Sequence, residues 1–268
     1  MTFGTVIFAA RRSLLCVAAI VLGFALHVAH AAAQAPDTIV RVKQSIVAVG
    51  TYQKTRNPPF VFRGTGFAIA DGTLIATNAH VLPETVATQS GEALVIIIPL
   101  GGGQLQRRDV TRSAVDAEHD LAIIKLTGPP LPALELTDSS TVREGQTFGF
   151  TGFPIGTILG LTPVTHRAMV SAVTPIVLPA TSAKQLDAKA VNRLKAGPFA
   201  VFQLDATAYP GNSGSPMYDD SGRVVAIVNM VFVKGSREAA LNQPSGIAFA
   251  IPARHLRELL SSESAGAR

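Results

Sequence analysis

From residue 45 to residue 251 the chain is a succession of short apolar runs rich in β-branched residues, separated by Gly, Pro and Asp. Such runs predict β-strands, because β-branched side chains pack well on a pleated surface and Gly and Pro favour turns. The expected strands are residues 45–52, 64–70, 73–77, 93–99, 121–126, 146–150, 168–173, 199–203, 224–233 and 246–251. Many short strands with little helix between them predict an all-β barrel or sandwich.

The proline-rich stretch at residues 129–132 divides these strands into two sets, because proline lacks the N–H that a strand must donate. Helical spacing is confined to three places. Residues 37–44 fit a short helix, residues 183–195 a polar helical insertion, and residues 252–260 a C-terminal helix that begins near a proline. No convincing internal repeat is present.

Composition is that of a globular chain. Hydrophobic residues make up 47% and charged residues 15% of the 268 positions, enough apolar material for a sizeable core. The net charge of +5 is small and unclustered, which argues against a nucleic-acid partner. Because Cys16 is the one cysteine, neither an intrachain disulfide nor a Cys-rich metal site can form.

The first 33 residues resemble an export signal. Arg11 and Arg12 precede an apolar run over residues 13–33, which contains the small-residue patterns Ala-His-Ala and Ala-Ala-Ala. This arrangement is typical of a secretory signal peptide, and the paired arginines also allow a twin-arginine signal. The alternative is an uncleaved membrane anchor, since about 20 apolar residues can span a bilayer. We therefore expect a leader at 1–33 and a folded domain at 34–268.

The segment GNSGSP at residues 211–216 places Ser213 between two glycines on a tight turn. A serine hydroxyl is a weak nucleophile that needs a base and a third group to orient that base. Glycine permits the backbone angles of such a turn, and the N–H groups of Gly211 and Ser213 can aim at one point as an oxyanion hole. Ser215 is the alternative nucleophile, although it precedes a proline and lacks the paired amides.

His80 follows an expected strand and is the candidate base, and Asp120 opens the apolar run 121–126 and is the candidate orienting acid. A carboxylate at the head of a buried strand is costly unless it is paired, and an imidazole N–H would pair it. Asp116 is a competing acid, and His119 should point away from Asp120 if the segment is extended. The order His, Asp, Ser is that of chymotrypsin.

Five segments together resemble the trypsin-like serine proteases of the HtrA (Deg) group: GTGF at 64–67, TNAHV at 77–81, DLAIIK at 120–125, PGNSG at 210–214 and GIAFAIP at 246–252. They occur in the family's order and cover roughly residues 37–260. The resemblance implies two six-stranded antiparallel barrels, about 37–135 and about 140–260, with the site in the cleft between them. It implies His80 as base, Asp120 as orienting acid and Ser213 as nucleophile, without metal or cofactor.

The sequence also departs from that family. Ser215 stands where a second glycine is usual, residues 181–200 match nothing in the family, and we find no peptide-binding PDZ domain. Asn212 replaces the aspartate that pairs with a new N-terminus in zymogen-type relatives, and an amide cannot form that ion pair. We therefore expect that cleavage before Ile39 does not activate the protein. Family members often form trimers through their N-terminal segment.

The resemblance places the base of the primary specificity pocket near Thr207 and its walls at Ile227, Val228, Asn229 and Met230. None of these residues is acidic, so a cationic substrate side chain would be buried without a partner, which is costly. The expected preference at the residue before the cleaved bond is therefore for small or aliphatic side chains.

These observations predict an exported serine endopeptidase that cuts polypeptides, unfolded ones among them, in quality control or processing of envelope proteins. A narrow exported endopeptidase with no housekeeping role would share the same chemistry. The alternative from another class is a catalytically silent binding module that keeps the protease fold.

Overall fold

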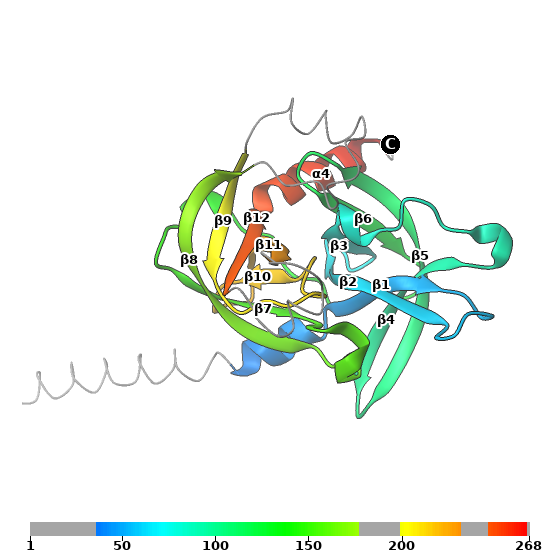
Figure 1. The fold of residues 1–268 in the computed structure, drawn as a ribbon. Coiled ribbons are helices and arrows are strands. Elements are labelled where there is room, and N and C mark those ends of the chain that lie inside the picture. Colours follow the sequence, from blue (N-terminus) through cyan, green and yellow to red (C-terminus); the bar gives the residue numbers. More distant parts are fainter. Residues whose placement is uncertain (1–35, 177–198, 232–245, 267–268) are drawn as a thin grey trace, which may run out of the picture.

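The computed structural model describes residues 36–176, 199–231 and 246–266, which form two closed β-barrels (Figure 1). The N-terminal barrel consists of β1 (Ile46–Tyr52), β2 (Phe60–Ile69), β3 (Leu74–Asn78), β4 (Ala93–Gly101), β5 (Gln104–Asp116) and β6 (Leu121–Leu126). The C-terminal barrel consists of β7 (Thr147–Gly152), β8 (Val164–Ile176), β9 (Phe199–Asp205), β10 (Pro216–Tyr218), β11 (Val224–Val231) and β12 (Ile247–Pro252). This architecture confirms the predicted pair of six-stranded antiparallel barrels.

Both barrels have the same strand order. The first closes as β1-β2-β3-β6-β5-β4, and the second, read from β7, as β7-β8-β9-β12-β11-β10. The two halves share topology although the sequence shows no repeat, because barrel closure depends on the alternation of inward and outward side chains and not on particular residues. Each barrel has no free sheet edge along its closed length.

Two strands were not expected from the sequence. In β5 only Val110 is buried, so its exposed polar residues lack the alternation that marks a half-buried strand. The strand β10 has three residues and begins with Pro216, which makes it too short to recognise by periodicity. Pairing with β4 and β6, and with β7 and β11, therefore decides that these segments are extended.

A helix at each end of the described chain ties the barrels together. Residues 36–43 are helical, and Thr38 Oγ1 donates to the Asp220 carbonyl of the C-terminal barrel at 2.9 Å. The helix α4 (Ala253–Gly266) follows β12 directly and contacts β5 and β6 as well as β11 and β12. The sequence predicted that the helix begins at Pro252, but Pro252 is the last residue of β12 and the helix begins at Ala253. The expected leader 1–33 and helix 183–195 lie outside the described residues.

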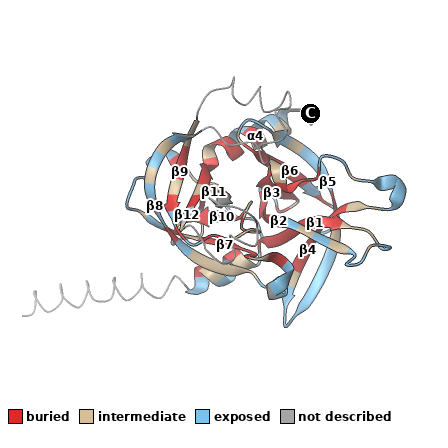
Figure 2. Ribbon diagram, viewed as in Figure 1, coloured by how far each residue is buried: buried red, intermediate tan, exposed pale blue. Residues whose placement is uncertain are grey.

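Buried residues lie along the strands of both barrels (Figure 2). The apolar ones among them form three clusters. One cluster fills the N-terminal barrel, with Ile75, Ile96 and Ile124 fully buried, and a second fills the C-terminal barrel around Phe150 and Leu204. The third cluster lies between the barrels and under α4, and joins residues of both. Full burial of each such side chain contributes about 1.5–3 kcal/mol, so the interface between the barrels is a substantial part of the core.

Within the segments that the structure describes, no helix is both long enough and apolar enough to cross a membrane.

Candidate active site

His80 lies immediately after β3, in the short 3-10 helix η1 (Ala79–Val81). Its side chain keeps 28% of its surface exposed, so the ring can meet a ligand while its backbone is held. The Arg63 Nε donates to the Val81 carbonyl at 2.7 Å, which fastens this turn to β2. The end of a buried strand thus presents His80 at the rim of the N-terminal barrel.

Asp120 immediately precedes β6 and adopts a left-handed backbone conformation, with φ of 53°. Its carbonyl accepts hydrogen bonds from the Ala79 N–H at 3.0 Å and from Asn78 Nδ2 at 3.1 Å, which stabilise this uncommon conformation. Its carboxylate accepts from the His80 N–H at 2.9 Å and lies 2.5 Å from the His80 Nδ1. The structure therefore brings His80 and Asp120 together as the sequence predicted.

Asn229 also binds the Asp120 carboxylate, a contact that sequence reasoning missed. The pairing of β11 with β12 is irregular between Val228 and Met230, so Asn229 is the extra residue of a bulge. Bulges next to active sites re-aim side chains. Here the fully buried Asn229 side chain donates from Nδ2 to Asp120 Oδ2 at 2.7 Å. The side chain of Asn229, which was predicted to line the specificity pocket, therefore binds the Asp120 carboxylate.

Ser213 lies beside the same residue. Its Oγ donates to the Asn229 carbonyl at 2.8 Å, so Asn229 contacts Asp120 through its side chain and Ser213 through its main chain. Among the described residues, Ser213 Oγ makes no hydrogen bond to His80. The three predicted residues are therefore gathered at the junction of the barrels, with the serine hydroxyl turned toward the carbonyl and not toward the imidazole.

The two amides expected to form the oxyanion hole, those of Gly211 and Ser213, donate to no acceptor within the described parts of the chain. The carbonyl of each peptide that carries one of them is occupied instead. The Pro210 carbonyl accepts from the Ile155 N–H at 2.8 Å, and the Asn212 carbonyl accepts from the Ser215 N–H at 3.0 Å. The N–H and C=O of a trans peptide point in opposite directions. The Gly211 N–H therefore points away from the Ile155 N–H, and the Ser213 N–H points away from the Ser215 N–H.

Ser215 stands where the family usually has a glycine, and Asn212 stands where zymogen-type relatives have an aspartate. Both residues are fully buried. The Ser215 Oγ and both polar side-chain atoms of Asn212 have no partner among the described residues. A Cβ added to Gly152 would collide with the Ser215 Oγ. The extra hydroxyl of Ser215 therefore occupies space that only a glycine at position 152 leaves open.

Asp116, the competing acid, is engaged elsewhere. Its carboxylate accepts from the main-chain N–H of His119 at 3.0 Å and lies 2.6 Å from the His119 Nδ1. This pair repeats the geometry of His80 and Asp120 but contacts neither Ser213 nor Asn229. His119 points away from Asp120, toward α4, as expected.

The His119 ring stacks on the ring of His255 in α4, with centroids 3.8 Å apart. The hydrogen bond with Asp116 raises the pKa of His119 above its ordinary value. Burial, together with the positive charges of His119 and Arg254, lowers the pKa of His255 to about 4, against a weaker opposing effect of Glu258. His255 is therefore neutral near pH 7 and accepts a hydrogen bond from Arg254 Nε at 3.3 Å.

This stack predicts a loss of stability in mild acid. Between pH 6.5 and about 4, the unfolded chain binds a proton at position 255 that the folded chain does not bind, so the free energy of unfolding falls as pH falls through that window. The contribution of His255 is about 2–3 kcal/mol across the window. The variant His255→Phe keeps the ring without the titration.

Urea unfolding at pH 7 and at pH 4.5 checks this prediction. The wild type should lose more stability between the two values than His255→Phe, while carboxylates common to both proteins cancel in the comparison. Equal losses in the two proteins would show that His255 does not titrate as its burial demands.

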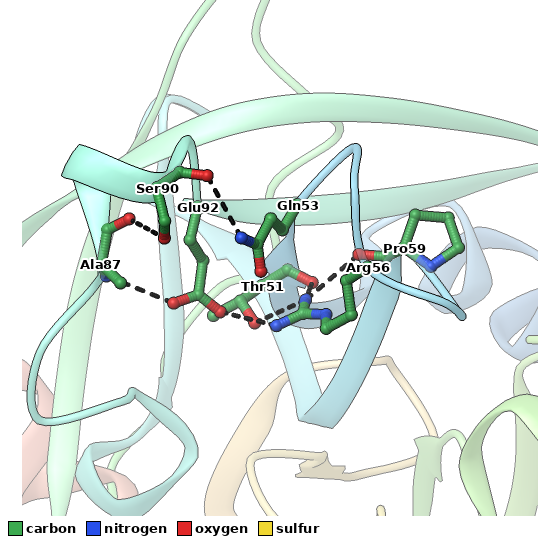
Figure 3. Close-up of polar contacts among 7 residues, drawn as sticks. All are labelled: Thr51, Gln53, Arg56, Pro59, Ala87, Ser90 and Glu92. Atoms are coloured by element: carbon green, nitrogen blue, oxygen red, sulfur yellow. Dashed lines mark hydrogen bonds and ion pairs between the residues drawn. The ribbon is translucent and has the colours of Figure 1, made fainter.

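A polar cluster fastens the loop that follows His80 to the loop between β1 and β2 (Figure 3). Arg56 donates to the Glu92 carboxylate at 2.8 Å and to the Thr51 carbonyl at 2.9 Å. The same carboxylate accepts from the Ala87 N–H at 3.2 Å, and Gln53 donates to the Ser90 carbonyl. Hydrogen bonds from Thr51, Arg56 and Ala87 lower the pKa of Glu92, so its carboxylate stays charged at neutral pH.

The other residues predicted for the specificity pocket differ in how far they are buried and in which part of the structure they contact. Thr207 is exposed just after β9, whereas Ile227 and Val228 are fully buried in two different apolar clusters. The side chain of Met230 is outside the described part. As side chains, Ile227, Val228 and Asn229 are thus committed to other contacts, and any pocket wall from this strand presents main chain.

Two closed barrels with a His–Asp pair on one and a serine turn on the other define the architecture of a chymotrypsin-type protease. The family model for the trypsin-like peptidase domain matches residues 64–227. The chain belongs to the trypsin-like peptidase family.

Curated relatives and solved structures agree with this assignment. The chain is 32% identical over 191 residues to a DegP-like periplasmic serine endoprotease of Chlamydia pneumoniae, covering 71% of this chain and 32% of the relative. It is 31% identical over 201 residues to the mitochondrial serine protease HTRA2 of Bos taurus, covering 75% and 36%. The matches therefore span about one third of the length of these relatives.

The fold is similar to that of the Rv3671c protease from M. tuberculosis in its active form, with a TM-score of 0.60, 18% identity and coverage of 84% of this chain and 82% of the other. It is also similar to the HtrA-type protease AlgW, solved with a decapeptide, with a TM-score of 0.59, 19% identity and coverage of 84% and 66%. At these identities the similarity concerns the fold alone.

Proposed function

We propose that this protein is a serine endopeptidase that hydrolyses peptide bonds through an acyl-enzyme. The observation that carries the proposal is the contact of the His80 ring with the Asp120 carboxylate at 2.5 Å, joined to Ser213 through Asn229. A buried carboxylate that accepts from the Nδ1–H of the imidazole holds the tautomer in which Nε2 is free to take a proton.

In the proposed reaction Ser213 Oγ attacks the carbonyl carbon of the peptide bond while its proton passes to His80 Nε2. The negative charge that develops on the carbonyl oxygen is stabilised by the N–H groups of Gly211 and Ser213. Collapse breaks the C–N bond, and the proton on His80 goes to the departing amine. Water then attacks the ester with His80 again as base, which releases the acid and restores Ser213.

In this structure the Ser213 Oγ donates to the Asn229 carbonyl, and this hydrogen bond must break before Ser213 can attack a substrate. Attack requires the hydroxyl to turn about its Cα–Cβ bond toward His80, since a base must lie within hydrogen-bond reach of the proton it removes. On the β10 side of β11, the Val228 N–H donates to the Ser215 carbonyl at 2.9 Å, and the Val228 carbonyl accepts from the Gly214 N–H at 2.8 Å. Beyond Val228 the described residues give β11 no main-chain partner on that side, so its main chain there can pair with an extended peptide. A substrate N–H that donates to the Asn229 carbonyl would compete with the Ser213 hydroxyl for this acceptor. It would thereby favour rotation of the hydroxyl toward His80.

The substrate class that fits is an extended polypeptide, including unfolded protein, with a small or aliphatic residue before the cleaved bond. This preference rests on the absence of an acidic residue at Thr207 and along 227–230. A peptide-library profile dominated by Arg or Lys would contradict it. The names of the DegP-like relatives support action in an exported compartment, and the leader, membrane anchor and trimer stay predictions.

A catalytically silent binding module is the second candidate, favoured by the serine hydroxyl that contacts a carbonyl and not the imidazole. Labelling the whole protein with a fluorophosphonate distinguishes the two, because this probe reacts with an activated serine. The proposal expects one label per chain, located by mass spectrometry on Ser213. Absence of label, or label on Ser215, would support the binding module or a different nucleophile.

A further inference from the structure

Thr65 of β2 is a fully buried residue of the N-terminal barrel whose polar atoms bind the nucleophile turn of the other barrel. Its N–H donates to the Ser213 carbonyl at 2.9 Å, and its Oγ1 donates to the Gly211 carbonyl at 2.7 Å. The same hydroxyl accepts from the Phe153 N–H at 3.1 Å. One side chain thus joins β2 to two separate loops of the C-terminal barrel.

The carbonyl of Thr65 connects to the strand that carries His80. It accepts from Thr77 Oγ1 at 2.7 Å, and Thr77 lies in β3 three residues before His80. A Cβ on Gly214 would collide with this carbonyl, so the turn approaches β2 as closely as a glycine permits. Thr65 therefore lies between the strand of the base and the turn of the nucleophile.

The peptide that Thr65 binds is the central one of the turn. The peptide from Pro210 to Gly211 carries one oxyanion amide, and its carbonyl is held by Ile155. The peptide from Asn212 to Ser213 carries the other amide, and its carbonyl is held by Ser215. The peptide between them, from Gly211 to Asn212, has its carbonyl held by the Thr65 hydroxyl.

We propose that Thr65 is a positioning residue whose hydroxyl docks the nucleophile turn on the N-terminal barrel and fixes the orientation of the Gly211 and Ser213 amides. Gly211 has φ of 106°, in the region where glycine moves freely, so its carbonyl rotates when its donor is lost. Rotation of the central peptide breaks the bond from the Asn212 N–H to the Tyr209 carbonyl, 3.0 Å long, and turns the flanking amides. The inference rests on the proposed function for its consequence in catalysis.

The test compares Thr65→Val, which removes the hydroxyl at nearly constant shape, with Thr65→Ser, which restores it. Thr151→Val is the matched control. Thr151 is fully buried, and its Oγ1 binds Tyr218 at 2.7 Å and Thr165 at 2.8 Å, away from the nucleophile turn. Unfolding by denaturant confirms that each variant is folded under the assay conditions.

The first measurement separates the maximal rate of fluorophosphonate inactivation from the affinity for the probe. Thr65→Val should lower the maximal rate about 10- to 100-fold and leave the affinity within about 3-fold, because complete loss of one oxyanion donor costs about 10²- to 10³-fold. Thr65→Ser and Thr151→Val should both stay within about 3-fold of wild type. A Thr65→Val rate equal to that of Thr151→Val, or a Thr65→Ser rate as low as that of Thr65→Val, would overturn the inference.

The second measurement does not depend on activity. Hydrogen exchange of a peptide covering residues 208–216 follows the amides of Asn212 and Ser215, which donate within the turn, and the amide of Gly214, which donates to the Val228 carbonyl of β11. Exchange should accelerate about 10-fold or more in Thr65→Val and stay at the wild-type rate in Thr151→Val. If the wild type takes no label, the proposed function fails and exchange alone decides whether Thr65 holds the turn. Unchanged exchange in Thr65→Val would refute the positioning role.

Discussion

Ser213→Ala is expected to lower kcat on an unfolded casein substrate by about 10⁴- to 10⁶-fold, because removal of one member of a cooperating triad removes nearly all that the triad contributes. The alanine variant should keep the fold, since the Ser213 Oγ makes a single hydrogen bond, to the Asn229 carbonyl, within the described parts of the chain. Initial rates for purified wild type and variant, together with their thermal unfolding, provide the comparison.

Ser215→Ala is the control for that experiment. Ser215 lies two residues away and is fully buried, but its hydroxyl has no partner among the described residues, so its loss removes no bond of the turn. Its rate should stay within about 3-fold of wild type. Retention of activity in Ser213→Ala, with loss in Ser215→Ala, would move the nucleophile to Ser215.

Asp120→Asn is expected to lower kcat by about 10⁴-fold, the cost of presenting the wrong imidazole tautomer in such a triad. The surroundings of Asp120 make the amide unfavourable in both orientations. With its NH₂ at the Oδ2 position it faces the Asn229 Nδ2 and forces His80 Nδ1 to act as acceptor. With its NH₂ at the Oδ1 position it faces the His80 main-chain N–H.

Asp116→Asn is the matched control, because Asp116 binds the ring and the main chain of His119 by the same two-point contact. It contacts no member of the proposed triad, so kcat should change less than about 3-fold. The rate of substrate hydrolysis and the urea midpoint of both variants give the comparison. Equal losses of kcat in Asp116→Asn and Asp120→Asn would point to a general effect on the N-terminal barrel.

Much of the fold could be predicted from local sequence. Buried strands such as β1 and β6 have continuous apolar runs bounded by turns, and their predicted positions differ from the observed ones by one residue or less. The strand β5 could not be predicted, because its residues face water on most positions and only its neighbours hold it extended. Long-range pairing overrides weak local preference in such segments.

The residue types of the site could also be predicted, but their partners could not. The positions of His80 after one strand and of Asp120 before a buried strand marked both residues as candidates. The structure places His80 Nδ1 2.5 Å from Asp120 Oδ2. The resemblance to the HtrA-type proteases placed Asn229 in a pocket wall. A bulge in β11 decided otherwise and turned its side chain to Asp120.

The sequence by itself thus determined the all-β class and the positions of most strands, and it supplied His80, Asp120 and Ser213 as the candidate catalytic residues. Tertiary structure alone decided that the Ser213 hydroxyl rests on the Asn229 carbonyl and that Thr65 holds the Gly211 carbonyl. The physical reason is that a strand pattern depends on neighbouring residues, whereas these hydrogen bonds join segments far apart in the chain. Their geometry depends on β-bulges and on how two separately closed sheets pack, and neither is encoded in any local run of residues.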